Sequence, residues 1–356
     1  MQFDFQLTTH VFFGQNRIAD IGSISAQFGA RHILLVTDPG IVATGHVERT
    51  VASLQRTSLT VDVFQDIQEN PTARHVESGV RFAQEAGNID FIIGLGGGSA
   101  MDCAKGINFL LTNGGKMEDY WGVGKVKKPM LPSIGIPTTA GTGSEAQSFA
   151  LISQENTHIK MACGDKKALF RAVILDPLLV QSVPKNVAAA SGLDAIAHAL
   201  ESYVSKEHTP FSQMLSREAW RLLERNFETI HSNPADITAW GNMQLGAHYA
   251  GAAIENSMLG AAHACANPLT AKYGITHGLA VAMMLPQVMR FNNEIASESY
   301  QELLKVTGLT NGHIDDSASH LIKRFSEMQN AACAPGKLSD FGVTEESLPA
   351  LAEAAA

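Results

Sequence analysis

The sequence has no excess of basic residues. Lys and Arg number 26 against 35 Asp and Glu, which gives a net charge of −9 at neutral pH. Proteins that bind nucleic acid neutralise phosphates with clustered basic side chains, and no such cluster is visible along the chain. The charge balance therefore argues against a nucleic-acid partner.

Cysteines and long apolar segments are also scarce. The four cysteines form no CxxC pair and no regular framework, which is typical of a reduced protein rather than of a disulfide scaffold. The N-terminus lacks a basic segment followed by an apolar one, and no apolar run approaches the roughly 18 residues of a membrane span. These absences predict a soluble, cytoplasmic protein without a membrane partner.

Short β-rich runs alternate with helical patterns in the first half of the chain. Helices are predicted at residues 41–56, at 72–87 and from Ser99 onward. Strands are predicted at residues 32–38, 59–64, 90–95, 132–137 and 173–175. This alternation indicates an α/β fold with a parallel, Rossmann-like sheet covered by helices on both faces.

The predicted secondary structure of the chain changes after Pro184. From there to the end β-rich runs almost disappear, while Ala-rich helical periodicity continues. Helices are predicted at residues 187–203, 211–230, 234–255 and 314–330, with a shorter helical segment at 279–284 that ends before Pro286. We therefore predict two domains, an α/β domain at residues 1–183 and an all-helical domain at residues 184–356.

A glycine-rich loop lies between a predicted strand and a predicted helix. It contains Gly96, Gly97, Gly98 and Ser99. Glycines let the backbone approach a ligand closely, and the free N–H groups at a helix start favour phosphate. A tight turn without a ligand would also need glycines, so the loop alone does not decide between the two interpretations.

Acidic Asp38 ends the first predicted strand, well before the glycine loop. In the usual Rossmann fingerprint the ribose-binding acid follows the glycines instead. If Asp38 meets the adenosine ribose, its carboxylate accepts from the 2′-hydroxyl and repels a 2′-phosphate, which favours NAD over NADP. Turn chemistry at Asp38-Pro39-Gly40 is an equally good explanation of these residues. A second polar, glycine-bearing turn at residues 137–145 strengthens the interpretation as a dinucleotide site.

Asp194 and His198 stand four residues apart in an apolar, Ala-rich stretch. This spacing places both on one face of a helix, close enough to share an ion. For this pair alone, an Asp–His hydrogen bond without metal is the simpler explanation.

Two further histidines favour the metal interpretation. His263 lies on another Ala-rich stretch, where a buried histidine needs a partner, and His277 begins a helical segment. One carboxylate and three imidazoles suit a divalent transition metal, and both Fe²⁺ and Zn²⁺ accept this ligand set. The other histidines look ordinary, and His10, His32, His46, His75 and His158 show no partner pattern.

The motifs taken together resemble the iron-containing (group III) alcohol dehydrogenase family. They are GGGSAMDCAK (96–105), PTTAGTGSE (137–145), SGLDAIAHALESYVS (191–205), NSMLGAAHA (256–264) and the pair His277-Gly278. The likeness extends over almost the whole chain.

The resemblance implies an N-terminal dinucleotide-binding domain and a C-terminal helical domain that carries the metal. The metal ligands would be Asp194, His198, His263 and His277. The dinucleotide contacts would be Asp38, Gly96, Gly97, Gly98, Ser99, Asp102, Thr138, Thr139 and Lys160. The resemblance also implies NAD as the cofactor, NADP less so, Fe²⁺ or else Zn²⁺ as the metal, and a homodimer or larger homo-oligomer.

One position departs from the family pattern. Many members have a second histidine four residues after the third metal ligand, where it is implicated in proton relay, and this chain has Asn267 there. An asparagine forms hydrogen bonds but does not shuttle a proton near neutral pH. Water, a ribose hydroxyl or another side chain would then carry the proton, or the substrate would differ from simple alkanols.

The predicted function is reversible oxidation of a small alcohol to an aldehyde or ketone by hydride transfer to NAD. On the same fold, a zinc-dependent polyol dehydrogenase or a dehydroquinate-synthase-like enzyme is the alternative, and a non-catalytic nucleotide sensor is a third possibility. The helical half shows no basic cluster for a phosphorylated substrate, which argues against the lyase. Phe149, Ile254 and Leu259 suggest an apolar substrate pocket, although a protein core would use such residues as well.

Overall fold

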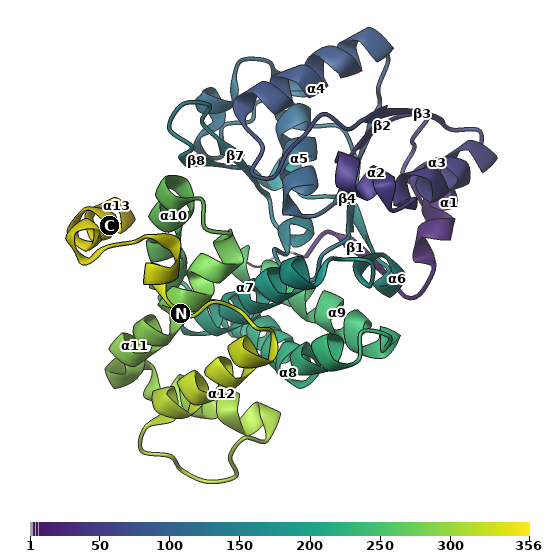
Figure 1. Cartoon of the computed structure of the whole chain (residues 1–356). Coiled ribbons are helices and arrows are strands. Elements are labelled where there is room, and N and C mark those ends of the chain that lie inside the picture. Colours follow the sequence, from purple (N-terminus) through teal and green to yellow (C-terminus); the bar gives the residue numbers. More distant parts are fainter. Residues whose placement is uncertain (1–2, 4, 6) are drawn as a thin grey trace. The chain divides into compact units, whose positions relative to one another are not determined.

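The structure of the chain is a computed structural model that describes residues 3, 5 and 7–356. These residues form two compact units (Figure 1). The α/β unit runs from the N-terminal region to Thr139 and includes Ser144–Ser182. The helical unit contains Ala140–Gly143 and Val183–Ala356, with Phe3 and Phe5. None of the described helices combines the length and the apolar character that a membrane crossing requires.

Six parallel strands form the main sheet of the α/β unit. Their order across the sheet is β1 (His10–Phe13), β9 (Ala172–Leu175), β6 (Ser133–Pro137), β4 (Phe91–Gly96), β2 (His32–Val36) and β3 (Thr60–Phe64). The predicted Rossmann-like parallel sheet is confirmed. The sequence did not predict β1, because this four-residue edge strand is mostly exposed and carries no clear apolar pattern.

Helices cover both faces of this sheet. On β2, Ile33 and Leu35 face one core together with α1 (Ile21–Gln27) and α3 (His46–Arg56). Leu34 and Val36 face the other core together with α4 (Ala73–Ala86) and α5 (Gly98–Asn113). Side chains alternate between the faces of a strand, so a strand buried on both faces is apolar at every position. This explains the continuous apolar run from Ile33 to Val36.

The strand order reverses beside β2. The chain passes from β2 outward to β3, returns to β4 on the other side of β2, and then continues through β6 toward β9. In open α/β sheets the carboxyl ends of the strands at such a reversal form a crevice that binds ligands. The ends of β2 and β4 are therefore the place in this unit that topology alone marks for a ligand.

Two features of the α/β unit differ from the predictions. The helix predicted at 41–56 is two helices, α2 (Pro39–Ala43) and α3, which are separated at Gly45 with a φ of +79°. A second, three-stranded sheet of β5 (Gly122–Val123), β8 (Lys160–Gly164) and β7 (Phe149–Ser153) was not predicted. Strand β5 has only two residues, and β8 contains Lys, Ala and Gly, which have a low intrinsic preference for β structure.

Three histidines without a partner pattern in the sequence do have partners in the structure. The pairs are His32 with Asp62, His46 with Ser182, and His75 with Thr72. The first two pairs bring together residues far apart in the sequence, so no local pattern reveals them. In the third, His75 is the N3 residue of α4 and accepts from the backbone N–H of Thr72 at the helix start.

The helical unit contains seven α-helices from Lys185 to the end of the described chain. They are α7 (Lys185–Val204), α8 (Pro210–Ser232), α9 (Ile237–Ile254), α10 (Ala261–Tyr273), α11 (His277–Thr307), α12 (Ser317–Ala331) and α13 (Leu348–Ala355). Four of them match the predicted helices within a few residues. Helix α11 is much longer than predicted, because it continues through Pro286. Proline removes one backbone hydrogen bond, which a well-packed helix can tolerate.

Helix α7 lies at the centre of this unit. Almost every residue from Ala188 to Tyr203 is buried, which explains why the helix is apolar nearly all round. Small residues allow the close packing. For example, a Cβ atom at Gly192 would lie 2.6 Å from the ring of Phe227 on α8. Polar side chains on α7 are therefore held in a dry and rigid environment.

Candidate metal centre and dinucleotide site

Helix α7 carries the first two predicted metal ligands. Asp194 and His198 are each 4% exposed, so the expected burial of this pair is observed. The His198 Nε2 atom lies 3.6 Å from the Asp194 Oδ1 atom. This distance is too long for a hydrogen bond. A simple Asp–His hydrogen bond is therefore not what holds the pair.

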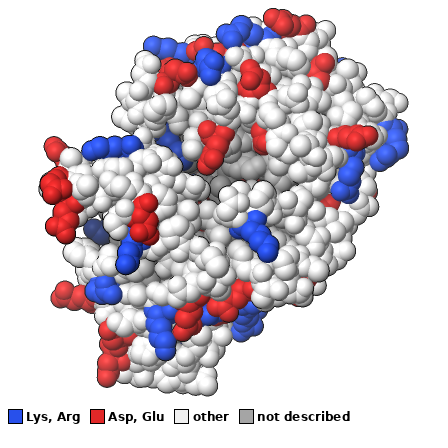
Figure 2. All heavy atoms as spheres, viewed as in Figure 1, with Lys and Arg blue, Asp and Glu red and all other residues white. Residues whose placement is uncertain are grey.

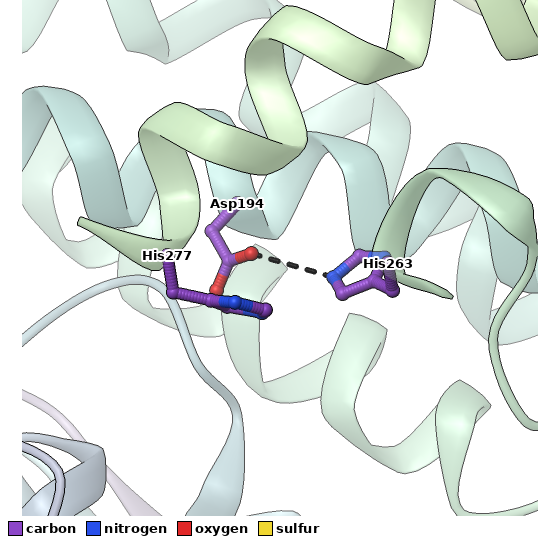
Figure 3. A group of neighbouring side chains, drawn as sticks. All are labelled: Asp194, His263 and His277. Atoms are coloured by element: carbon purple, nitrogen blue, oxygen red, sulfur yellow. Dashed lines mark ion pairs between the residues drawn. The ribbon is translucent and has the colours of Figure 1, made fainter. Parts of the chain in front are cut away.

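The other two predicted ligands lie where two helices begin. His263 is the third residue of α10, and His277 is the first residue of α11. The side chains of Asp194, His263 and His277 converge (Figure 3), and one ligand atom from each lies within 4.8 Å of the others. Metal–ligand distances of about 2 Å allow three atoms so spaced to share one ion.

His198 borders this group of three. Its ring stacks on that of His263, with the centroids 4.7 Å apart and an interplanar angle of 19°. The structure thus brings all four residues together, with three of them already converging and His198 packed against the group.

Two buried polar atoms at this centre indicate that the residues fit a metal ion. Asp194 Oδ1 and His263 Nε2 are 3.4 Å apart, and neither has a hydrogen-bond partner among the described residues. Buried polar atoms are nearly always paired, because leaving them unpaired is costly. A divalent cation would satisfy both atoms at once, so the residues present fit a metal.

Burial and the neighbouring charges set the protonation of these groups. Burial alone would raise the pKa of Asp194, but His198, His263 and His277 outweigh it and lower that pKa, so the carboxylate stays ionised. Burial lowers the pKa of His198 to about 4, which keeps this imidazole neutral and able to bind a metal. For His263 burial acts in the same direction, but Asp194 and Glu201 outweigh it and raise the pKa to about 9. A metal that binds His263 must displace this proton.

Several of the predicted dinucleotide residues gather at the topological reversal of the α/β unit, whereas Lys160 begins β8 in the smaller sheet. Asp38 follows β2 and accepts a hydrogen bond from the Ile41 backbone N–H at 3.1 Å, so the turn interpretation also holds. Its Oδ2 atom would lie 3.3 Å from a Cβ atom at Gly96, which has a φ of +151°. Thr138, after β6, donates its backbone N–H to the Gly96 carbonyl at 2.9 Å.

The glycine loop continues directly into α5. Gly97 is the N-cap residue and Gly98 the first residue of the helix. Thr139 lies beside Gly97, since a Cβ atom there would be 3.5 Å from its side chain. Ser99 accepts a hydrogen bond from the Asn70 backbone N–H at 3.2 Å. Backbone N–H groups at a helix start, beside glycines without side chains, form a ready site for phosphate.

The model of the family described as "Iron-containing alcohol dehydrogenase" matches residues 8–177. That described as "Fe-containing alcohol dehydrogenase family, C-terminal" matches residues 188–356. The chain belongs to the iron-containing alcohol dehydrogenase family. The resemblance stated from the motifs is thereby confirmed.

Individual relatives agree over nearly the full length. Alcohol dehydrogenase 4 of Schizosaccharomyces pombe is 35% identical over 349 residues, which cover 98% of this chain and 82% of that protein. A crystal structure of 1,3-propanediol oxidoreductase has a TM-score of 0.96 and 32% identity, and the match covers 100% of this chain and 93% of that one. Sulfoacetaldehyde reductase from Bifidobacterium kashiwanohense, in complex with NAD⁺, has a TM-score of 0.89 and 26% identity, with 100% and 92% covered.

This iron-containing alcohol dehydrogenase is an NAD- and metal-dependent oxidoreductase that interconverts an alcohol and an aldehyde or ketone by hydride transfer. The matches to alcohol dehydrogenases do not favour the alternative as a polyol dehydrogenase or a dehydroquinate-synthase-like enzyme. On the face of the described residues drawn in Figure 2, basic and acidic side chains are interspersed without a broad patch of either sign.

Sequence reasoning missed one residue at the metal centre of this alcohol dehydrogenase. Glu201 is 3% exposed and lies on α7, seven residues after Asp194 and three after His198. Its Oε2 atom is 2.5 Å from the His263 Nδ1 atom. The spacing of Asp194, His198 and Glu201 on one helix face was the available signal.

Another predicted cofactor residue, Asp102, belongs to a buried network in the α/β unit. Asp102 is 8% exposed, and its Oδ1 accepts a hydrogen bond from Ser144 Oγ at 2.6 Å. Lys105 Nζ lies 3.7 Å from the same oxygen and donates to the Ser144 and Phe149 carbonyls at 2.7 Å. Burial raises the pKa of Asp102, against the opposing effects of Lys105, Ser144 and Lys160. Asp102 is thus positioned to hold the loop around Ser144.

The residues named for an apolar pocket are packed in different ways. Ile254 is 5% exposed and belongs to the interior of the helical unit. Phe149 covers the Gly164 backbone, since a Cβ atom there would lie 2.4 Å from its ring. Leu259 is half-buried just before α10, and Asn267 is exposed one turn after His263 on that helix. Of the three apolar residues, only the position of Leu259 beside α10 supports a pocket near the metal ligands.

Proposed function

We propose that Asp194, His198, His263 and His277 bind one divalent ion in this enzyme. The proposal rests on the convergence of an ionised carboxylate with imidazoles. In particular, the buried Asp194 Oδ1 and His263 Nε2 atoms face each other, and neither has a hydrogen-bond partner among the described residues. We propose Fe²⁺ because the family is described as iron-containing, and the same ligand set would accept Zn²⁺. When bound, the ion supplies a Lewis acid for the substrate oxygen.

We infer that the dinucleotide binds where β2 and β4 end. In this proposal the Asp38 carboxylate accepts from the adenosine ribose and disfavours a 2′-phosphate, which selects NAD over NADP. The backbone of Gly96–Ser99 holds the pyrophosphate at the start of α5, and Thr138, Thr139 and Lys160 complete the contacts. Asp102 acts through Ser144 on the loop that follows Thr139. Residues 1–183 would then be the NAD-binding domain and residues 184–356 the metal-binding domain.

The substrate that we propose is a small alcohol and its aldehyde or ketone. A matched relative oxidises or forms 1,3-propanediol according to its name, which makes short diols a first choice for screening. Asn267 offers a hydrogen bond but no proton transfer, so we propose that water or a ribose hydroxyl carries the proton released on oxidation. We also propose that the enzyme is a cytoplasmic homo-oligomer, in line with its four free cysteines and the family resemblance.

The substitution His263→Ala tests the proposed metal role. It removes one ligand whose Nε2 faces Asp194, so metal content should fall to near zero and turnover should fall by more than about 1000-fold. NADH binding, followed by NADH fluorescence, should remain because the dinucleotide residues lie in the other unit. His320→Ala, at an exposed position on α12, serves as the control. Near-normal turnover or retained metal in His263→Ala would contradict the proposal.

A further inference from the structure

One buried carboxylate outside the predicted ligand set contacts the metal centre directly. Glu201 binds the His263 ring with Oε2 and accepts the Ala262 backbone N–H with Oε1 at 2.7 Å. Glu201 therefore binds both the imidazole and the first turn of the helix that carries it.

The surroundings leave this carboxylate little freedom. A Cβ atom at Gly260 would lie 2.7 Å from Glu201 Oε1, so only glycine permits this approach without a shift. With 3% exposure, Glu201 cannot rotate into water. Each of its oxygens has a defined donor, which fixes the direction of both hydrogen bonds.

A carboxylate at this place determines which nitrogen of His263 carries the proton. An ionised carboxylate only accepts hydrogen bonds, so Nδ1 of His263 must be the donor. In the neutral ring the lone pair is then on Nε2, the atom that faces Asp194. Together with Asp194, Glu201 also gives the site two buried negative charges, which a divalent cation neutralises.

We propose that Glu201 is a positioning residue of the metal centre, which keeps the proton of His263 on Nδ1 and thereby presents the Nε2 lone pair to the ion. This proposal rests on the proposed role of His263 as a metal ligand. The alternative is that Glu201 only caps the first turn of α10. The two roles differ in what a glutamine at this position would do.

The substitution Glu201→Gln separates these roles. Its amide oxygen can still accept from the Ala262 N–H, which preserves the cap, while its NH₂ group donates to His263 Nδ1. The neutral ring must then carry its proton on Nε2, which blocks metal binding. Affinity for Zn²⁺, measured by competition with a chelator, should fall by about 10–100-fold. A folded Glu201→Gln protein with wild-type affinity would overturn the proposal.

Two matched variants make the outcome specific. Glu224→Gln changes another buried carboxylate of the helical unit, paired with Arg324 at 2.8 Å, and should leave the Zn²⁺ affinity unchanged. Loss of affinity in both variants would indicate a general effect of destabilisation and overturn the positioning role. His263→Ala tests the underlying site, since an unchanged affinity there refutes the proposed function itself. If Glu201→Gln keeps its affinity while His263→Ala loses it, the positioning role fails and the metal site stands.

A measurement on the wild-type protein covers the case in which Glu201→Gln does not fold. In the zinc-loaded enzyme, ¹⁵N NMR of the histidine rings should show His263 protonated at Nδ1 and metal-bound at Nε2, with its signals assigned by their loss in His263→Ala. Metal bound at Nδ1, or a proton on Nε2, would overturn the proposal.

Discussion

His46 is a neutral, buried histidine that should make the stability of the protein depend on pH. Burial, together with the nearby positive charge of Arg49, lowers its pKa from 6.5. Below pH 6.5 the unfolded chain takes up a proton that the folded protein resists. The contribution to stability is therefore full above pH 6.5 and is lost as the pH falls toward the folded-state pKa.

The substitution His46→Gln removes this titration and retains a group that can bind Ser182. The free energy of unfolding, measured by urea titration, should fall less steeply from pH 6.5 to pH 5 in His46→Gln. The difference in slope should be at most about 1.4 kcal/mol per pH unit, because a single proton is involved. An equal slope in wild type and His46→Gln would contradict the assignment. His313→Gln, at an exposed position, is the control.

At the residue scale, the sequence pointed to the four proposed ligands but not to Glu201, whose carboxylate contacts one of them. Asp194 and His198 are visible because their i, i+4 spacing interrupts an apolar stretch. Glu201 sits near the end of the same helix, where a glutamate usually faces water. Its role depends on the first turn of α10, more than fifty residues later in the chain, and local periodicity does not predict such an approach.

The start of helix α11 depends on close packing against α7. A Cβ atom at Gly278 would lie 2.1 Å from the Ala190 carbonyl oxygen and 3.1 Å from the Asp194 side chain. Gly278 directly follows the proposed ligand His277. Any side chain here must displace the helix start and, with it, the imidazole.

The substitution Gly278→Ala should therefore weaken metal binding although alanine favours helices. The free energy of unfolding should fall by about 1–3 kcal/mol, as expected for overpacking, and Zn²⁺ affinity should fall with it. Chemical denaturation and chelator competition measure the two effects. Gly312→Ala is the control, because nothing lies within 4 Å of a Cβ atom there. A Gly278→Ala protein more stable than wild type would show that α11 does not begin under this constraint.

At the element scale, the periodic helices and apolar strands were predicted well, and the errors fall at single residues that mark boundaries. The helical segment predicted at 279–284 ends before Pro286, yet α11 continues through this proline, because tertiary packing offsets one missing hydrogen bond. Gly45 was expected inside a helix, yet it separates two, because its φ of +79° is incompatible with helix. Proline disfavours a helix interior and glycine permits a positive φ, but the tertiary packing decides whether a helix ends at either residue.

At the scale of the whole molecule, the proposed domain roles predict two distinct ligand effects on unfolding. Zn²⁺ should raise the unfolding temperature of the helical unit, and NAD⁺ that of the α/β unit. Each ligand at a hundred times its dissociation constant should add about 2.7 kcal/mol to the unit that binds it. Differential scanning calorimetry with each ligand, and with His263→Ala, measures the shifts. A zinc shift that persists in His263→Ala would refute the assignment of the metal to these ligands.

The division into two units shows a limit of sequence reasoning at this scale. The change near Pro184 from alternating strands and helices to helices alone is visible in the sequence. The membership of Ala140–Gly143 in the helical unit is not. This segment fits because a Cβ atom at Gly143 would lie 2.6 Å from the Gly251 Cα on α9. Such backbone-to-backbone contacts follow from the three-dimensional arrangement, and a glycine in the sequence does not reveal its neighbour.

The spread of the proposed ligands along the chain has a consequence for biosynthesis. Asp194 and His198 share one helix, but His263 and His277 follow only after α8 and α9 have been made. While the chain emerges from the ribosome, a nascent α7 can offer an ion two ligands at most. Full capture must await residue 277 and the packing of the intervening helices, so metal loading would be a late event in maturation, after most of the helical unit has folded.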